Sequence, residues 1–303
     1  MYHYQAFQLT ISSEMMIPEL LEFPEKTSGI DVKIQFGIVA VDGLVAPLNK
    51  GVFFQVNETM LWLHVPKIAR FLVTQGQHIT IDPIADADED SIRIFLLGSC
   101  FGALLMQRSL FVLHGSAIQV GNYSFSIAGP SGVGKSTLSG AFLNRGYSIL
   151  ADDICAVNQT GEVLPSFPQI KLWADAAKKL KIDTSSLKKI RPSIEKYALP
   201  LDSHFQPAPL ALKMIYILNS HNKSELNIMN LTGAKKLQPL RNQLYRLNYL
   251  KNIVQESVTL QQCGFIANRV GLVKISRPES GFSLDKLVNS IEGDLINRGF
   301  IVI

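Results

Sequence analysis

Alternating apolar and polar positions over residues 1 to about 90 predict a β-rich region. Phe7–Ile11 and Val32–Phe36 repeat with the period of two that is typical of a half-buried strand. The second segment runs into the continuously apolar Gly37–Val41, which predicts that the strand continues. Asn57-Glu58 lies between two apolar runs and suits a tight hairpin. The other predicted strands of this region span residues 51–56, 59–65, 68–73 and 78–82.

An acidic segment, Ala85–Asp90, precedes the most apolar stretch of the chain, Ile94–Met106. Its carboxylates suggest either a Ca²⁺ loop or the acidic N-terminus of a helix. Because the segment lacks the glycine and the final glutamate of an EF-hand, the helix N-terminus is favoured. The apolar stretch is shorter than the ~18 residues of a membrane span, so it predicts a buried helix at 91–107. We expect a β-rich N-terminal domain at 1–107 and a second domain at 108–303.

From Leu110 onward the hydrophobic pattern changes to that of an α/β domain. Residues 183–209 contain several prolines and predict mostly loop. The predicted strands span residues 110–120, 123–128, 147–157, 213–218 and 270–275. Helical spacing predicts helices after residue 135, at 171–181, from 240 to about 267, and at 284–297.

Composition narrows the class of protein to which the chain belongs. The 303 residues are 47% hydrophobic and 18% charged, which is typical of a well-packed soluble protein. A net charge of +4 is too small for a nucleic-acid footprint, and the lysines between residues 178 and 191 are read as a solvated face. Three scattered cysteines indicate reduced thiols. Since no signal peptide or membrane span is predicted, we expect a cytoplasmic protein that binds neither nucleic acid nor membranes.

A phosphate-loop motif, G-x-x-x-x-G-K-[ST], follows the predicted strand at 123–128 and opens a helix. Its glycines allow backbone N–H groups to converge on a phosphate, and the helix N-terminus adds a positive dipole. Lys135 is expected to reach the β- and γ-phosphates, and the hydroxyl of Ser136 to hold Mg²⁺. The alternative is a glycine-rich turn between a core strand and a core helix. The predicted nucleotide-binding residues are Gly129, Pro130, Ser131, Gly132, Val133, Gly134, Lys135, Ser136 and Thr137.

Two adjacent carboxylates, Asp152 and Asp153, interrupt an apolar strand. On opposite faces of a strand, at least one of them is buried away from water, which is costly unless a cation or a hydrogen-bond donor meets it. The alternative, a solvated strand end, is disfavoured by the apolar residues on both sides. At the carboxyl end of a strand, the pair faces the crevice of the phosphate loop. One aspartate is expected to hold Mg²⁺ and the other to accept a proton from an attacking hydroxyl.

The ordered set of sequence motifs resembles the catalytic domain of HPr kinase/phosphorylase. The matching segments are His114-Gly115, Gly129–Ser136, Arg145-Gly146 and Ala151–Asp153. His114 by itself reads as a core histidine, and only the resemblance makes it a candidate site residue. The fold that the resemblance implies is an α/β P-loop kinase domain of the HPr-kinase type, preceded by the smaller β-rich domain.

The resemblance also implies roles for these residues and for partners. Asp152 would be the general base toward a serine hydroxyl, with His114 close to it, while Asp153 and Ser136 would bind Mg²⁺. The implied cofactors are ATP and Mg²⁺, and the implied partner is a peptide or protein with an acceptor serine. Because HPr-kinase relatives often form hexamers, a homo-oligomer is implied as well.

The sequence departs from the HPr kinases in two places. Thr137 stands where those enzymes usually carry an acidic residue, and their arginine- and asparagine-rich C-terminal signature is missing. The chain, including Pro18-Glu19-Leu20, is more similar to divergent HPr-kinase-related proteins, some of which phosphorylate the C-terminal serine of a lasso-peptide precursor. In that group the region of Lys196-Tyr197 recurs, so Lys196 is either a nucleotide or acceptor contact or a surface lysine.

These observations together lead us to expect a kinase that phosphorylates a serine hydroxyl of a peptide or protein. Two alternatives stay open at this point. One is a small-molecule kinase on the same fold, because the loops at 183–209 do not reveal the acceptor. The other is a nucleotide-sensing module without phosphoryl transfer, which the second aspartate of the Asp152-Asp153 pair disfavours because binding needs at most one metal carboxylate.

Overall fold

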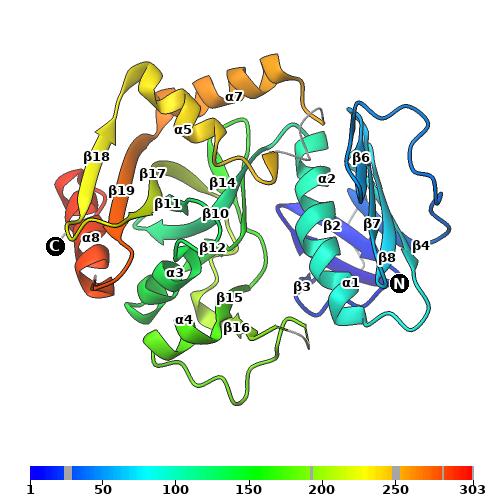
Figure 1. Ribbon diagram of the computed structural model, residues 1–303, viewed down its shortest axis with the longest axis horizontal. Helices are drawn as coiled ribbons and strands as arrows, with labels where there is room; N and C mark the ends of the chain where they lie inside the picture. Colours follow the sequence, from blue (N-terminus) through cyan, green and yellow to red (C-terminus); the bar gives the residue numbers. More distant parts are fainter. Residues whose placement is uncertain (24–28, 192–193, 248–252, 282, 302–303) are drawn as a thin grey trace.

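Two large β-sheets and the helices that cover them make up the structure, a computed structural model. It describes residues 1–23, 29–191, 194–247, 253–281 and 283–301. A helical segment, residues 89–107, packs against the first sheet, with β1 and β2 of that sheet running alongside it toward the second half of the chain (Figure 1). The mixed α/β class expected from the sequence is therefore confirmed.

The N-terminal sheet has nine strands in the order β3-β1-β2-β4-β9-β8-β7-β6-β5. Most neighbours are antiparallel, but β4 pairs in parallel with both β2 and β9. The strands are β1 (Tyr2–Ala6), β2 (Leu9–Ser13), β3 (Leu21–Glu22), β4 (Val32–Phe36), β5 (Asn49–Lys50), β6 (Phe54–Val56), β7 (Met60–Val65), β8 (Ala69–Thr74) and β9 (His78–Pro83).

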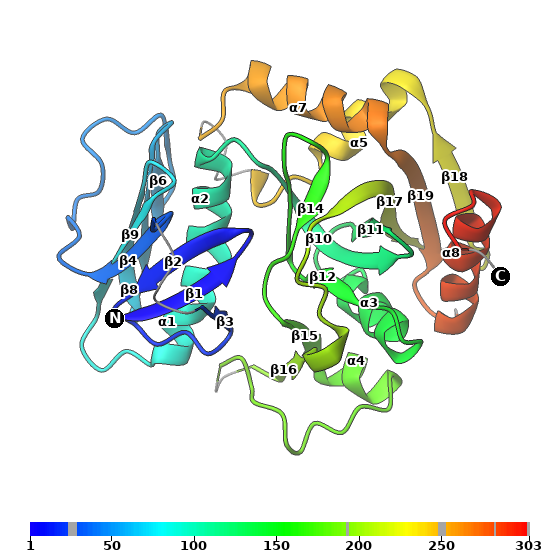
Figure 2. The same ribbon diagram turned by 180° about the vertical axis from the view of Figure 1, so that it is seen from behind.

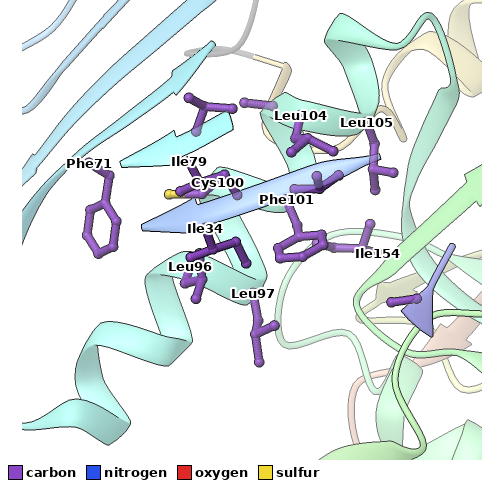
Figure 3. Packing of buried hydrophobic residues seen from close by; sticks show 14 of the residues in the cluster. Ile34, Phe71, Ile79, Leu96, Leu97, Cys100, Phe101, Leu104, Leu105 and Ile154 are labelled. Carbon is purple, nitrogen blue, oxygen red and sulfur yellow. The ribbon is translucent and has the colours of Figure 1, made fainter. Parts of the chain in front are cut away.

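The helical segment consists of α1 (Glu89–Phe95), the π-helical turn η1 (Leu96–Cys100) and α2 (Phe101–Gln107). Asp88 caps its N-terminus by accepting a hydrogen bond from the backbone N–H of Ser91, as the acidic segment predicts. Its buried face packs on the first sheet, and Figure 3 shows Leu97 and Phe101 in one cluster with Ile34. The same cluster includes Ile154 from the second half of the chain, so the apolar core continues past residue 107. The domain division at 107/108 stays a prediction.

The second sheet has eight strands, with β10 in contact with three of them, β11, β12 and β13. Strands β11, β17 and β19 are mutually parallel, as α/β sheets are at their centre. The strands are β10 (Phe111–Val120), β11 (Tyr123–Ala128), β12 (Ile149–Ala151), β13 (Ile154–Val157), β14 (Glu162–Leu164), β17 (Leu210–His221), β18 (Asn227–Leu231) and β19 (Gly271–Pro278).

Helices cover both faces of this sheet, as seen from the two sides in Figures 1 and 2. One core lies between the sheet and α3, α4 and α8, and another lies between the sheet and α5 and α7. A separate two-stranded ribbon pairs β15 (Gln169–Trp173) with β16 (Lys196–Pro200). The remaining elements are α3 (Lys135–Asn144), α4 (Ala174–Lys179), η2 (Asp202–His204), η3 (Gly233–Lys236), α5 (Leu237–Arg241), α7 (Glu256–Arg269) and α8 (Leu284–Asn297).

Several elements match the strands and helices expected from the sequence. Strand β4 covers the alternating segment Val32–Phe36, and helix α8 has the predicted bounds. The predicted pair at 68–73 and 78–82 forms the antiparallel β8 and β9. The hairpin at Asn57 is confirmed, because its backbone N–H donates to Met60 and its side chain accepts from Thr59. Helix α3 ends at Asn144, and Gly146 follows at a left-handed φ of 85°, which glycine adopts without strain.

Other expectations were wrong for local reasons. Phe7 is not in a strand but, with Gln8, forms the turn between β1 and β2 at a left-handed φ of 53°. Gly37–Val41 does not continue β4, and Ile38 is 95% exposed. Residues 171–173 belong to strand β15, so the helix predicted at 171–181 is shortened to α4.

The long helix expected from 240 to about 267 is divided. Helix α5 ends at Arg241 and α7 begins at Glu256, while residues 248–252 lie outside the described part of the chain. Strands β16 and β18 were not predicted. No described helix is both long and apolar enough to cross a membrane.

Candidate active site

The phosphate-loop motif connects β11 to α3, as the strand-loop-helix pattern predicts. Gly129, Gly132 and Gly134 adopt φ angles of 149°, 80° and 104°, a region in which a side chain is strained. A Cβ on Gly129 would lie only 2.4 Å from the backbone oxygen of Leu218. Glycine is therefore required here for the loop to pass close to β17.

The lysine of the motif, Lys135, is the first residue of α3 and is buried. Its Nζ donates to the backbone oxygens of Gly129 (2.8 Å) and Pro130 (3.0 Å), and it lies 3.1 Å from Nε2 of His114. Burial lowers the pKa of Lys135, while the carboxylates of Asp153 and Asp152 oppose that shift. Ser136 and Thr137 follow in the first turn of the helix, both partly exposed.

Strand β10 brings the predicted site residues to one place. It pairs antiparallel with β11 on one side and with β12 and β13 on the other, so β11 and β12 run in the same direction. Ala128, just before the phosphate loop, lies opposite Gly115, while Ala151, just before the aspartates, lies opposite Ala117. The phosphate loop, His114 and the aspartates therefore meet at the same edge of the sheet.

A histidine contact joins the lysine of the loop to one of the aspartates. Nδ1 of His114 lies 3.2 Å from Oδ1 of Asp153, and Nε2 faces the Nζ of Lys135. Because an ammonium group only donates, Nε2 accepts from it and Nδ1 carries the proton that is donated to Asp153. The histidine was expected beside Asp152, but in the structure it pairs with Asp153.

Asp153 occupies the break between β12 and β13 at a left-handed φ of 71°. Its side chain is 36% exposed, so it is the more accessible aspartate of the pair. Burial by itself raises the pKa of Asp153. The hydrogen bond from His114 and the charges of Lys171 and Lys196 outweigh burial and hold this pKa well below its ordinary value. Asp153 is therefore ionised at neutral pH, as a metal ligand must be.

Asp152 is 7% exposed and held by two protein donors. The hydroxyl of Ser116 donates to Oδ1 at 2.8 Å, and the backbone N–H of Lys171 donates to Oδ2 at 2.9 Å. The carboxylate is thus fixed between β10 and β15. Each of its oxygens has a second lone pair, so both can still accept a further hydrogen bond.

Lys196 lies on the ribbon beside the phosphate loop rather than on an isolated surface loop. Its Nζ is 5.6 Å from the centre of the Trp173 ring, and its charge acts on both Asp153 and Lys135. Register explains the position, since Lys196 pairs with Trp173 across the ribbon. The contact with nucleotide or acceptor stays a prediction.

Two cationic residues near the site were missed at the level of sequence. Arg277, near the end of β19, donates from Nη2 to the backbone oxygen of Val133 in the phosphate loop at 2.8 Å. Lys171, in β15, bonds Asp152 through its main chain and acts on the charge of Asp153. Both are polar positions of strands in which polar and apolar residues alternate, and no local motif distinguishes them from ordinary surface residues.

The donor set fits a hydrated Mg²⁺ ion that is shared with a nucleotide. Within the described residues, no group of three or more His, Cys, Asp or Glu residues is placed to hold a metal ion. Mg²⁺ usually keeps several waters and takes only one or two carboxylates together with substrate phosphates. Asp153 and the hydroxyl of Ser136 are residues of that kind, at the mouth of a glycine loop whose Gly132 has open space where a Cβ would be.

Comparisons with known proteins add little to this geometry. No family model matches the chain, and no curated protein matches it. Among solved structures, the Hpr(Ser) kinase/phosphatase from Coxiella burnetii is 12% identical, with 62% of this chain and 92% of that chain covered. The TM-score of 0.31 is too low to carry an argument about fold or chemistry. The functional case therefore rests on the residues of this chain.

Proposed function

We propose that this protein is an ATP-dependent kinase that phosphorylates a hydroxyl group, with a serine of a peptide or protein as the acceptor. The observation that supports it most is the position of the phosphate-loop motif, His114 and two adjacent aspartates at one edge of the second sheet. Nucleotide binding alone needs no second carboxylate. Phosphoryl transfer uses one carboxylate for the metal and another to orient the acceptor hydroxyl.

In this proposal, each group has a separate task. Backbone N–H groups of the phosphate loop and the ammonium group of Lys135 bind the nucleotide phosphates. Asp153, oriented by His114, and the hydroxyl of Ser136 hold Mg²⁺. Asp152 orients the acceptor hydroxyl and accepts its proton. Bound Mg-ATP would supply the phosphoryl group and partly neutralise the charge that develops on it.

The decisive variant is Asp152→Asn, because it removes the charge with little change in shape. The amide oxygen can accept from the N–H of Lys171, and the amide nitrogen can donate to the hydroxyl of Ser116, so both present contacts survive. We expect phosphoryl transfer to fall about 10²- to 10⁴-fold, the usual contribution of a positioned acid or base. Mass spectrometry of serine-containing peptides after incubation with Mg-ATP measures this change.

Two further variants separate binding from transfer. Ser116→Ala removes one contact of Asp152 but keeps the carboxylate, so a much smaller loss is expected. Lys135→Ala should weaken the binding of a fluorescent ATP analogue. Equal phosphorylation by wild type and Asp152→Asn would contradict the mechanism, and unchanged ATP affinity in Lys135→Ala would contradict the phosphate-loop assignment. Transfer to small molecules alone would favour a small-molecule kinase. Transfer to no acceptor, with ATP binding intact, would favour a nucleotide sensor.

A further inference from the structure

A cavity lies beside the ribbon strand whose Lys171 bonds Asp152, and no residue of the phosphate-loop motif lines it. Its volume is about 280 Å³, and it lies between the N-terminal half of the chain and the ribbon of β15 and β16. Pro18, Glu19 and α1 form one wall, and the ribbon with residues 186–190 forms the other. This volume is at the lower end of the range of about 300–1,000 Å³ for small-molecule pockets, so the cavity can hold one large side chain of a longer molecule.

The ribbon connects the cavity to the proposed transfer site. In an antiparallel pair, residues opposite each other project to the same face, and that face repeats every second residue. Gln169 and Lys171 line the cavity together with their partners Pro200 and Ala198. The next position along the same face is the pair of Trp173 and Lys196. This face therefore runs from the cavity, past the main-chain contact of Lys171 with Asp152, to the lysine that acts on Asp153 and Lys135.

Most of the charges around the cavity are paired, but Oε2 of Glu19 is buried with no hydrogen-bond partner among the described residues. Arg93 pairs with Glu19 and Asp90, Lys188 pairs with Asp90, and Lys189 pairs with Glu195. Lys171 also lines the cavity, but no hydrogen bond or ion pair of its ammonium group is found within the described residues. Its charge acts on Asp153 through space. An anionic group at the mouth of the cavity would pair with this lysine.

The walls away from these charges are apolar. They are formed by Pro18, Ile94, Leu97, Leu187, Ile190, Ala198 and Pro200. An apolar side chain that enters between them leaves water, which favours binding. Gln169 and Ser186 are the uncharged polar side chains of the lining, and a charged side chain placed against the apolar walls would lose its hydration.

We infer that the cavity binds the acceptor substrate of the proposed kinase, and that this substrate is an extended peptide segment with an apolar side chain and a neighbouring carboxylate close to the phosphorylated serine. The apolar side chain occupies the cavity, and the carboxylate pairs with Lys171. Lys171 both lines the cavity and bonds Asp152, so the cavity is close to the transfer site. Because an extended chain advances about 3.3 Å per residue, the serine lies within about four residues of the apolar side chain. The inference rests on the proposed function and specifies its acceptor.

The test uses a synthetic peptide library with one fixed serine and variable flanking positions, incubated with the full chain and Mg-ATP. We expect selection of Leu, Ile, Met or Phe at one flanking position and of Asp or Glu at another. Lys171→Ala keeps the backbone N–H that bonds Asp152, so the loss should appear as a rise in KM for acidic peptides of roughly tenfold or more. Selection at the acidic position should disappear.

Ala198→Leu fills the cavity and provides a second, independent variant. It should raise KM for peptides with an apolar flanking residue while the binding of a fluorescent ATP analogue stays unchanged. The matched control is Lys178→Ala, which removes an exposed lysine of α4 that does not line the cavity. Equal rates for all flanking sequences, or Lys171→Ala and Ala198→Leu that behave like Lys178→Ala, would overturn the inference and leave the kinase proposal intact.

A binding measurement separates failure of the inference from failure of the proposed function. Trp173 lies on the same ribbon face and is half exposed, so its fluorescence should change when peptides with an apolar residue near an acidic one bind without nucleotide. If no peptide is phosphorylated, the kinase proposal fails, and the titration alone decides about the cavity. Saturable binding that Ala198→Leu abolishes would support the cavity as a peptide site, and no fluorescence change with any peptide would overturn it.

Discussion

Two adjacent aspartates occupy very different environments because of one backbone angle. Strand β12 ends at Ala151, and Asp153 follows in a left-handed conformation with its side chain beside His114. Asp152 stays buried under Ser116 and the main chain of Lys171. In a regular strand the two side chains would project to opposite faces. The break therefore keeps both carboxylates at one edge of the sheet, with Asp153 partly exposed to solvent and Asp152 buried.

The low pKa of Asp153 leads to a prediction about stability and pH. A carboxylate whose pKa is lower in the folded state stabilises the protein above the unfolded pKa of about 4, and this contribution is lost as pH falls. The free energy of unfolding of wild type should therefore begin to approach that of Asp153→Asn as pH falls below about 5, and should continue to do so below about pH 3, because the folded-state pKa lies well below the ordinary value. Urea unfolding at several pH values measures the difference.

His114→Phe provides the control for this prediction. It removes the hydrogen bond that holds the pKa of Asp153 low, so Asp153→Asn should change the pH dependence less in that background. A difference between wild type and Asp153→Asn that stays constant over the whole pH range would contradict the prediction.

At the scale of elements, β10 can pair closely with β11 at the site because Gly115 of β10 has no side chain. A Cβ on Gly115 would lie 2.5 Å from the backbone oxygen of Ile127 and 3.2 Å from Cα of Ala128. Backbone atoms of a neighbouring strand cannot turn away as a flexible side chain can. Glycine at this position thus allows β10 and β11 to stay paired up to the start of the phosphate loop.

Gly115→Ala should therefore lower the free energy of unfolding by about 1–3 kcal/mol, the usual cost of overpacking, and weaken nucleotide binding. Gly264→Ala is the matched control, because Gly264 lies inside α7 with no heavy atom within 4 Å of an added Cβ. The control should stabilise the protein by about 1 kcal/mol through helix propensity. Urea unfolding of both variants tests this, and a stable Gly115→Ala with normal ATP binding would contradict it.

Periodicity predicted those elements whose burial follows the local pattern. Burial alternates over residues 32–35 as the sequence does, although Phe36 is exposed, and residues 284–297 form an amphipathic helix with one buried face. The hydrophobic pattern did not predict the secondary structure where backbone geometry or tertiary contacts determine it. Phe7 is fully buried although it lies in a turn, and Lys171 is in a strand because the ribbon pairs it with Ala198.

The candidate site was predictable only in part. The phosphate-loop motif and the adjacent aspartates are local in sequence, and the structure places them at one sheet edge. The pairing of His114 with Asp153, the contact of Arg277 with Val133 and the approach of Lys171 all depend on strand register between distant segments. No single stretch of sequence contains that information.

At the scale of the molecule, the two halves share an apolar core. The ring of Phe167, just before the ribbon, lies 5.4 Å from that of Phe7 and 6.0 Å from that of Phe101. The backbone N–H of Phe7 also donates to the oxygen of Pro165 at 2.7 Å. Because the cavity proposed for the acceptor is lined from both halves, this junction also determines its shape.

Phe167→Ala should accordingly destabilise the whole molecule and not one half of it. Loss of a buried phenylalanine costs about 3–5 kcal/mol. The two tryptophans report separately, Trp62 from the first sheet and Trp173 from the ribbon. In the single-tryptophan proteins Trp173→Phe and Trp62→Phe, urea midpoints should coincide, and Phe167→Ala should lower both together. Midpoints that separate, with only one of them shifted by Phe167→Ala, would show that the halves unfold independently and that Phe167 does not couple them.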